Sequence, residues 1–175
     1  RRVLFRSLFS DGAGAVTLEP AAPSQFLGWW LGADGSQYDM IGIPAGGSRE
    51  PMTPESVVEG RHLMKMARGA SLFKQAVHAM VHAGKEAMRA AGVQAPDIDL
   101  WIPHQANARI TRDAGALLGI PAEKTIDIIA AYGNSSAATI PIALAHAAEH
   151  GRLQRGQLIL LTAAGGGMVS GGVVK

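Results

Sequence analysis

The sequence predicts an α/β fold in which a mixed, mostly parallel sheet carries helices on both faces. From residue 71 onward, segments with apolar residues at three- and four-residue spacing alternate with short apolar runs. The order is helix, strand, helix, strand, helix, strand, strand. Strands that alternate with helices are joined by right-handed crossovers and pair mainly in parallel. With 175 residues, 47% of them hydrophobic, the chain is long enough for one domain with a proper core.

The first third of the chain predicts short strands and loops. Residues 1–7 carry three arginines and do not begin with methionine, and we interpret them as a truncation scar. A DGAG turn precedes a short strand at 15–18, and further strands are expected within 26–35 and at 40–44. Residues 45–56, rich in Gly, Pro and Ser, predict a loop.

The first long helix is expected at 71–91, where apolar residues form one stripe and basic and histidine residues form the opposite side. Gly92 stands where a C-terminal glycine cap belongs. A strand at 99–103 then leads into a helix at 106–118, which Gly119 ends.

The last part of the chain predicts a strand at 125–133, an Asn-Ser-Ser cap and an apolar helix at 136–149. Pro141 lies in the early turns of this helix and is expected to kink it. A buried strand at 157–167 runs into three glycines, and a final strand at 168–175 is expected to pair with it antiparallel.

The composition excludes several classes of protein. The net charge is +2 and no run of lysine or arginine dominates, so nucleic-acid binding is not expected. The chain has no cysteine and therefore no disulfide, thiol nucleophile or cysteine-based zinc site. No apolar run approaches the roughly 18 to 20 residues that span a bilayer. We expect a soluble, cytoplasmic protein that binds neither nucleic acid nor membrane.

Three junctions between strands and the segments that follow them carry unusual residues. His104 follows the strand at 99–103, Asn134 precedes a helix, and glycines occupy 165–167. In open α/β sheets, ligands bind where strand carboxyl ends meet helix amino ends. Each feature also has a structural interpretation: a structural histidine, a helix N-cap and a simple turn. Together, an imidazole, an amide and exposed backbone N–H groups suit the stabilisation of an oxyanion.

Three motifs carry a family resemblance: PHQAN at 103–107, YGNSSAATIP at 132–141 and LLTAAGGG at 160–167. Together they resemble the C-terminal half of the β-ketoacyl-acyl-carrier-protein synthase III family, and the DGAGAV and GASLFKQAV stretches are also similar to it. The resemblance implies a thiolase-like fold of two similar halves stacked as five alternating α and β layers. Residues 1–22 would then be a leader plus a remnant of the N-terminal half, and 23–175 the C-terminal domain.

The family uses a Cys–His–Asn set whose cysteine lies in the first half. By motif, His104 and Asn134 match the other two members. The resemblance implies that they cradle the negative charge that develops when a malonyl thioester loses CO2. It also implies that the N–H of Gly166 forms part of an oxyanion hole. Gln105 and Asn107 are expected to brace the loop.

The resemblance further implies a surface for an acyl carrier protein. Lys74 and Arg109 match basic positions near the family's docking surface, which would attract an acidic partner. The alternative is that these residues, with Lys85, Arg89 and Arg112, only form solvated helix faces.

Three small or flexible residues depart from the family's pattern. Ala70 replaces a frequent asparagine, while Ala164 and Met168 replace aromatic residues. These substitutions suggest a roomier tunnel for the acyl chain or the pantetheine, so the acyl group is left open.

The leading hypothesis is an acyltransferase of fatty acid or related biosynthesis, a homodimer when intact. It would condense an acyl group from acyl-coenzyme A with malonyl-acyl-carrier-protein and need no cofactor. This chain would be its C-terminal catalytic half, inactive without the N-terminal half. The alternative is a non-catalytic scaffold subunit that pairs with a cysteine-bearing protein. A third possibility is a metal site at His78/His82 or His146/His150, whose i, i+4 spacing allows chelation; neither pair has the Glu of an HExxH motif, and we expect no metal.

Overall fold

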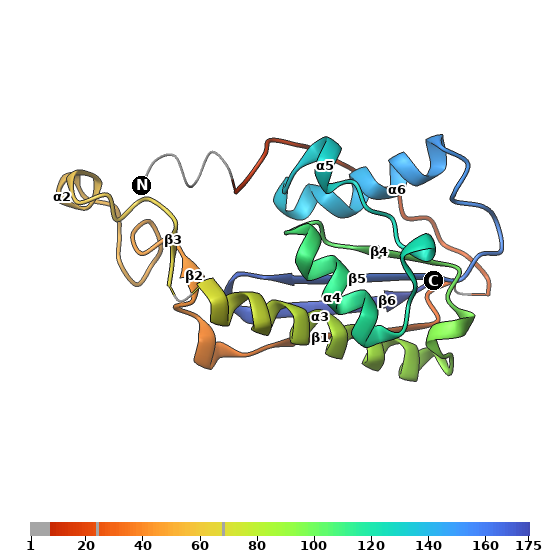
Figure 1. Ribbon diagram of the computed structural model, residues 1–175. Helices are drawn as coiled ribbons and strands as arrows, with labels where there is room; N and C mark the ends of the chain where they lie inside the picture. Colours follow the sequence, from red (N-terminus) through yellow and green to blue (C-terminus); the bar gives the residue numbers. More distant parts are fainter. Residues whose placement is uncertain (1–7, 24, 68) are drawn as a thin grey trace.

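A four-stranded sheet forms the centre of the computed structural model, which describes residues 8–23, 25–67 and 69–175 (Figure 1). The strand order is β1-β6-β5-β4. The bounds are β1 Gly28–Ala33, β4 Leu100–Pro103, β5 Ile159–Gly165 and β6 Val169–Val174. Strands β4 and β5 are parallel, whereas β6 pairs antiparallel with both β5 and β1.

The sheet is mixed, as predicted, and its last strand is antiparallel, but the prediction that it is mostly parallel was wrong. Two of the three strand pairs are antiparallel. The reason is the short connection between β5 and β6, a turn at Gly166–Met168, which reverses the chain without a crossover helix. Strand β1 then adds to the free edge of β6.

Helices cover both faces of the sheet, as the sequence predicts. Figure 1 shows α3 (Gly69–Ala91) and α4 (Ala108–Leu118) on one face, with α5 (Ile129–Tyr132) and α6 (Thr139–Glu149) on the other. Because side chains alternate along a strand, β4 contributes to both cores. Trp101 packs in the core under α3 and α4, while Leu100 and Ile102 pack against α6.

Helix α3 lies directly on the backbone of β1 and β6. A Cβ atom added to Gly172 would stand 2.3 Å from the carbonyl oxygen of Ala83, and one added to Gly28 would stand 2.3 Å from the amide nitrogen of Ala91. Only glycine allows so close an approach of helix to sheet. This contact fixes the carboxyl half of α3 against β1 and β6.

The segment between β1 and α3 extends beyond the end of the sheet (Figure 1). The strand expected at 40–44 is reduced to β2 Ile41–Gly42, which pairs with β3 Lys65–Met66. The loop predicted at 45–56 continues into a short helix, α2 Pro54–Val58. The side chains of Thr53 and Ser56 form a capping box at its start, which explains why this Pro- and Ser-rich stretch still forms one helical turn.

Two strand predictions were wrong. Residues 15–18 form no strand, and the side chains of Val16 and Leu18 are exposed. The chain before them contacts the loop that precedes α6 instead: the N–H of Ser10 donates to the carbonyl of Asn134 at 2.9 Å. At 125–133 only Thr125 forms a bridge, to Trp101, and the chain then turns into α5.

The remaining helices begin and end close to the predicted positions. Helix α3 ends before Gly92 and α4 before Gly119, and both glycines have positive φ angles. Helix α4 begins two residues later than expected because Asn107 is its N-cap. Pro141 is the third residue of α6, where the amide has no intrahelical partner to lose, so the expected kink is not required. Residues 1–7, interpreted as a scar, lie outside the described residues.

Within the described residues, no helix is both long and apolar enough to cross a membrane.

Candidate active site

The polar residues singled out from the sequence lie at one end of the sheet. The carboxyl ends of β4 and β5 and the amino ends of α3, α4 and α6 meet there, on the left in Figure 1. The backbone N–H of His104 donates to the carbonyl of Thr162 at 2.8 Å, so the residue after β4 is still tied to β5. This arrangement places His104 at the edge where ligands bind in α/β sheets.

His104 is only partly buried, and its ring is held by one side chain. Nδ1 lies 2.6 Å from Oγ1 of Thr139. Burial lowers the pKa of His104 below its ordinary value, because a charged imidazolium loses solvation there. The ring is therefore neutral at physiological pH. In the described part of the chain, Nε2 has no hydrogen-bond partner, so this nitrogen is available to a ligand.

Asn134 is oriented by the turn that follows it. Its Oδ1 accepts the backbone N–H of Ser136 at 3.0 Å. This bond turns the amide oxygen toward the backbone and leaves Nδ2 without an acceptor among the residues that the structure describes. Asn134 is not the N-cap of α6, since that helix begins at Thr139 after a short turn at Ser136–Ala138. The side chain thus presents a free amide donor.

Thr139 connects the two residues. Its hydroxyl contacts the His104 ring and also lies 3.0 Å from the carbonyl oxygen of Ser136, whose N–H orients Asn134. Thr139 is completely buried. No role was expected for this residue from the sequence. Its only signal was a polar side chain in a markedly apolar helix.

Gln105 and Asn107 both support the loop after β4. The buried amide of Gln105 donates from Nε2 to the carbonyls of Pro103 and Ile126, each at 3.0 Å, and its Oε1 accepts the N–H of Ile128. Oδ1 of Asn107 accepts the N–H of Arg109 at the start of α4. These contacts fit the supporting role expected for the two residues.

Gly166 lies directly after β5 and is exposed, with Gly167 beside it in the left-handed conformation at φ 73°. A Cβ on Gly166 would be 3.6 Å from the carbonyl oxygen of Ile41, so β2 covers one side of the turn. The glycine turn therefore stands at the same sheet end as His104.

A cavity of about 480 Å³ lies between the starts of α3 and α4 and is lined by Gly69, Ala70, Phe73, Lys74 and Arg109. The guanidinium of Arg109 stacks over the ring of Phe73, 5.2 Å from its centre. The structure thus brings Ala70, Lys74 and Arg109 together. Ala164 does not line this cavity; it packs against the core beneath α3 and α4.

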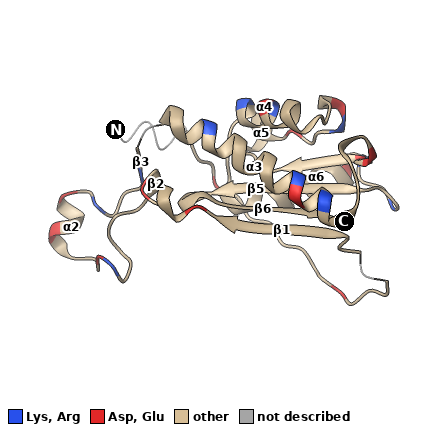
Figure 2. Cartoon of the chain, turned by 90° about the horizontal axis from the view of Figure 1, so that it is seen from below, with Lys and Arg blue, Asp and Glu red and all other residues tan. Residues whose placement is uncertain are grey.

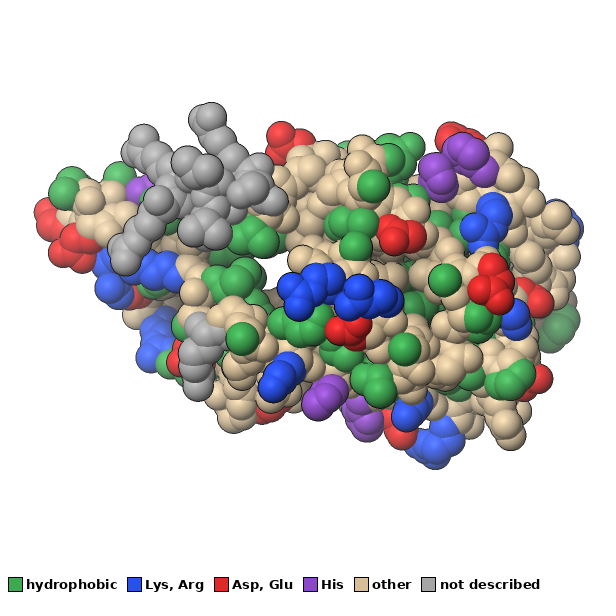
Figure 3. Space-filling model, in the orientation of Figure 1, with side chains coloured by type: hydrophobic (Ala, Val, Ile, Leu, Met, Phe, Trp, Pro, Cys, Tyr) green, Lys and Arg blue, Asp and Glu red, His purple; other side chains and the backbone are tan. Residues whose placement is uncertain are grey.

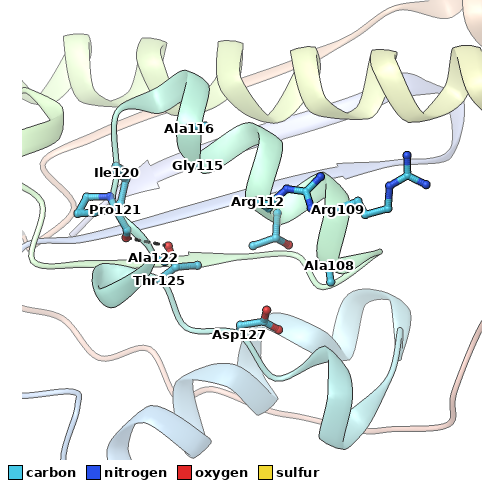
Figure 4. A pocket seen from close by; sticks show the side chains of 11 residues that line it. Ala108, Arg109, Arg112, Gly115, Ala116, Ile120, Pro121, Ala122, Thr125 and Asp127 are labelled. Atoms are coloured by element: carbon cyan, nitrogen blue, oxygen red, sulfur yellow. Dashed lines mark hydrogen bonds between the residues drawn. The ribbon is translucent and has the colours of Figure 1, made fainter.

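A second cavity, of about 560 Å³, opens on the other side of α4 (Figure 4). Arg109, Arg112 and Asp127 provide its charged groups, and its walls are otherwise mostly apolar. Figure 3 shows Lys and Arg side chains gathered over α4.

The other basic residues of these helices are less distinctive. Figure 2 marks the basic positions along α3 and α4. Arg89 pairs with Glu86 and Arg112 with Asp113, each on the surface of its own helix, and Lys85 is exposed. These contacts favour the solvated-face interpretation for the three residues.

The histidine pairs make other contacts. The rings of His146 and His150 stack 4.0 Å apart, and Nδ1 of His150 lies 2.8 Å from the carbonyl of His146. The ring of His82 packs edge-on against Trp30. No group of three or more potential metal ligands is found within residues 8–23, 25–67 and 69–175.

Comparisons with known proteins agree with one another. Residues 88–175 match the family model described as 3-oxoacyl-[acyl-carrier-protein (ACP)] synthase III C terminal. The chain is 49% identical over 169 residues to a 3-oxopimeloyl-[acyl-carrier-protein] synthase of Rhodothermus marinus, covering 96% of this chain and 49% of that protein. It is 46% identical over 162 residues to a beta-ketoacyl-[acyl-carrier-protein] synthase III of Roseiflexus sp., covering 92% of this chain and 49% of the relative.

Solved structures show the same similarity. The crystal structure of 3-oxoacyl-(acyl carrier protein) synthase III from Pseudomonas aeruginosa superposes with a TM-score of 0.75 at 33% identity, covering 89% of this chain and 46% of that one. The structure of the synthase III from Aquifex aeolicus gives a TM-score of 0.74 at 36% identity, covering 87% and 45%. The chain therefore spans about half the length of the relatives that it matches.

Proposed function

The chain belongs to the 3-oxoacyl-[acyl-carrier-protein] synthase III family, with a thiolase-like fold, and we propose that it supplies the His–Asn part of an acyltransferase active site. The observation that carries this proposal is the pair of free donors at one end of the sheet. Nε2 of His104 and Nδ2 of Asn134 have no acceptor in the described part of the chain, and Thr139 and Ser136 connect their loops.

In the proposed reaction, a cysteine thiolate from the N-terminal half attacks the carbonyl carbon of an acyl-coenzyme A and releases coenzyme A. The acyl group is then held as a thioester. Malonyl-acyl-carrier-protein binds next and loses CO2, which leaves an enolate on the remaining thioester. The enolate carbon attacks the acyl group, the cysteine thiolate leaves, and a 3-oxoacyl-carrier-protein is formed. The reaction needs no metal or organic cofactor.

His104 and Asn134 act in the decarboxylation step. Negative charge builds on the thioester oxygen, where both donors can bond to it, and each well-placed donor stabilises such charge by about 3 to 4 kcal/mol. Because burial keeps the imidazole neutral, His104 acts as a hydrogen-bond donor without losing its proton. We assign the N–H of Gly166, together with the cysteine's own N–H, to the oxyanion hole for acyl transfer.

The proposal also covers the domain organisation of the chain and the oligomeric state of the intact enzyme. Residues 23–175 form the C-terminal domain, 1–22 are a leader with a remnant of the other half, and the intact enzyme is a homodimer. Because its proposed substrates are acyl-coenzyme A and malonyl-acyl-carrier-protein, we propose that the enzyme acts in the cytoplasm. The alternative is a scaffold subunit without a catalytic role, paired with a cysteine-bearing protein.

Co-expression with a cysteine-bearing N-terminal half of a family member tests the proposal. We expect condensation of acyl-coenzyme A with malonyl-carrier-protein only when both halves are present and His104 is intact. A complex that condenses equally well with His104→Ala would support the scaffold alternative. An isolated chain that is active on malonyl thioesters would contradict both.

The acyl group is best determined with a panel of primers. One relative is named for a 3-oxopimeloyl product, a seven-carbon chain with a second carboxylate, while the others are named more generally. Condensation adds two carbons, so a five-carbon dicarboxylic acyl-coenzyme A would be the matching primer. Ala70, beside the cavity between α3 and α4, is compatible with a bulkier primer than acetyl. The relative kcat/KM values of acetyl, longer acyl and five-carbon dicarboxylic primers decide among these.

Reversing the charge of Lys74 and Arg109 is expected to weaken the use of the carrier protein. In the double variant Lys74→Glu, Arg109→Glu, repulsion of an acidic carrier should raise the KM for malonyl-carrier-protein about tenfold or more at low salt, since charges at a docking rim mainly change association. The kcat with a malonyl-pantetheine substrate that has no protein part should change little. Steady-state kinetics at two salt concentrations measure both.

The matched control is Lys85→Glu, Arg89→Glu, which reverses two charges farther along α3, away from the cavity. It should leave the KM for the carrier protein nearly unchanged. An equal rise in KM for both double variants would show that only the net charge matters, and it would contradict a docking site at Lys74 and Arg109.

A further inference from the structure

We propose that Phe73 is a positioning residue whose ring holds the guanidinium of Arg109 ready for an acidic partner. The contact between the ring and the guanidinium carries the positioning itself. Its consequence for the reaction rests on the function proposed above, because there the acidic partner is the acyl carrier protein.

Arg109 stands where its charge does not stabilise its own helix. It is the second residue of α4 and directly follows the first turn's cap, in which Asn107 accepts its N–H. A cation in the first turn of a helix faces the positive end of the helix dipole. The ion pairs found among the described residues do not include Arg109, and its side chain is exposed. Its place therefore serves contact with a partner rather than the stability of α4.

The ring of Phe73 provides a firm platform for this side chain. Phe73 lies in the second turn of α3 and packs against the core under α3 and α4, while it remains partly exposed. Cζ of Arg109 lies over the ring, 5.2 Å from its centre. Such a contact attracts the cation without binding its N–H donors as a carboxylate would. The donors stay free, in the planar fork that matches a partner's carboxylate.

The contact also decides which side of α4 the guanidinium serves. Arg109 lines both cavities, with Lys74 on the α3 side and Asp127 on the other. An arginine side chain without a platform would be repelled by Lys74 and attracted by the carboxylate of Asp127. Figure 4 shows Arg109 extending away from Asp127. Phe73 thus keeps two cations beside one cavity, an arrangement that complements an acidic surface.

Ring-current shifts test the positioning directly in the full chain. The Nε–H and Cδ protons of Arg109, identified by their loss in Arg109→Gln, should lie upfield of their usual positions because the side chain lies over an aromatic face. In Phe73→Leu they should return to the usual positions. Unshifted protons in the unaltered protein would overturn the proposal at once.

Kinetics of the enzyme assembled with its cysteine-bearing half test the consequence. Phe73→Leu keeps an apolar side chain against the core but removes the ring. At low salt it should raise the KM for malonyl-carrier-protein about two- to fivefold, the range of an exposed cation–π contact, and leave kcat/KM for malonyl-pantetheine unchanged. Phe73→Tyr keeps the ring and should retain the original KM. An equal loss with malonyl-pantetheine, or an equal rise in KM for the tyrosine variant, would show that Phe73 only shapes the cavity.

A double-mutant cycle decides whether the ring acts through Arg109. In the Arg109→Gln background, Phe73→Leu should cause no further rise in the KM for the carrier protein. The same rise in both backgrounds would contradict the proposal, since the ring would then act without Arg109. If the ring-current shift is present but Arg109→Gln leaves the KM unchanged, the carrier site proposed above fails, while the positioning of Arg109 by Phe73 stands.

Discussion

Replacing His104 by alanine in the assembled enzyme is expected to lower the rate of malonyl decarboxylation by about 10²- to 10³-fold, and Asn134→Ala should have an effect of the same order. In the proposed site, each substitution removes one of the two donors to the enolate oxygen. Neither residue is assigned a part in the first acyl transfer, so acylation of the cysteine should be largely spared. Release of labelled CO2 from malonyl-carrier-protein measures the first step, and mass spectrometry of the acyl-enzyme measures the second.

The control for these variants is His78→Ala, which removes an exposed histidine from the outer side of α3. It should leave both partial reactions unchanged. The double variant His104→Ala, Asn134→Ala should lose less than the product of the single effects, because the two donors act on one oxygen. Loss of acylation without loss of decarboxylation would mean that the roles are assigned wrongly.

The second large effect is expected on stability, from Gln105→Met. Methionine has a similar volume but cannot bond to the carbonyls of Pro103 and Ile126 or to the N–H of Ile128. Each buried group that loses its partner costs about 1–3 kcal/mol, so the free energy of unfolding should fall by about 3 kcal/mol or more. Urea unfolding followed by circular dichroism measures the change.

Gln25→Met is the matched control, because Gln25 is exposed and no side-chain bond is found for it among the described residues. It should change the free energy of unfolding by less than about 0.5 kcal/mol. A loss of stability that is equally small in Gln105→Met would show that water replaces the amide and that Gln105 does not brace the loop.

Local patterns predicted the helices and the general architecture well. The apolar stripe of α3 and the glycines at 92 and 119 marked where helices end, since both signals depend on neighbouring residues only. The strand at 15–18 and the long strand at 125–133 failed for the opposite reason. A short apolar run forms a strand only where another strand offers its edge, and that depends on distant parts of the chain.

The sequence by itself determined which chemical groups stand at the ends of β4 and β5 and before α6: His104, Asn134 and the glycine turn. It also determined the family, through three motifs whose spacing can be read directly. Only the tertiary structure decided the antiparallel pairing of β1 with β6, the grouping of Lys74 with Arg109, and the bond between His104 and Thr139. These three features join residues far apart in sequence, and a hydrogen bond depends on placing two atoms within a few tenths of an ångström. The packing of α6 on the sheet provides that precision, and no local pattern encodes it.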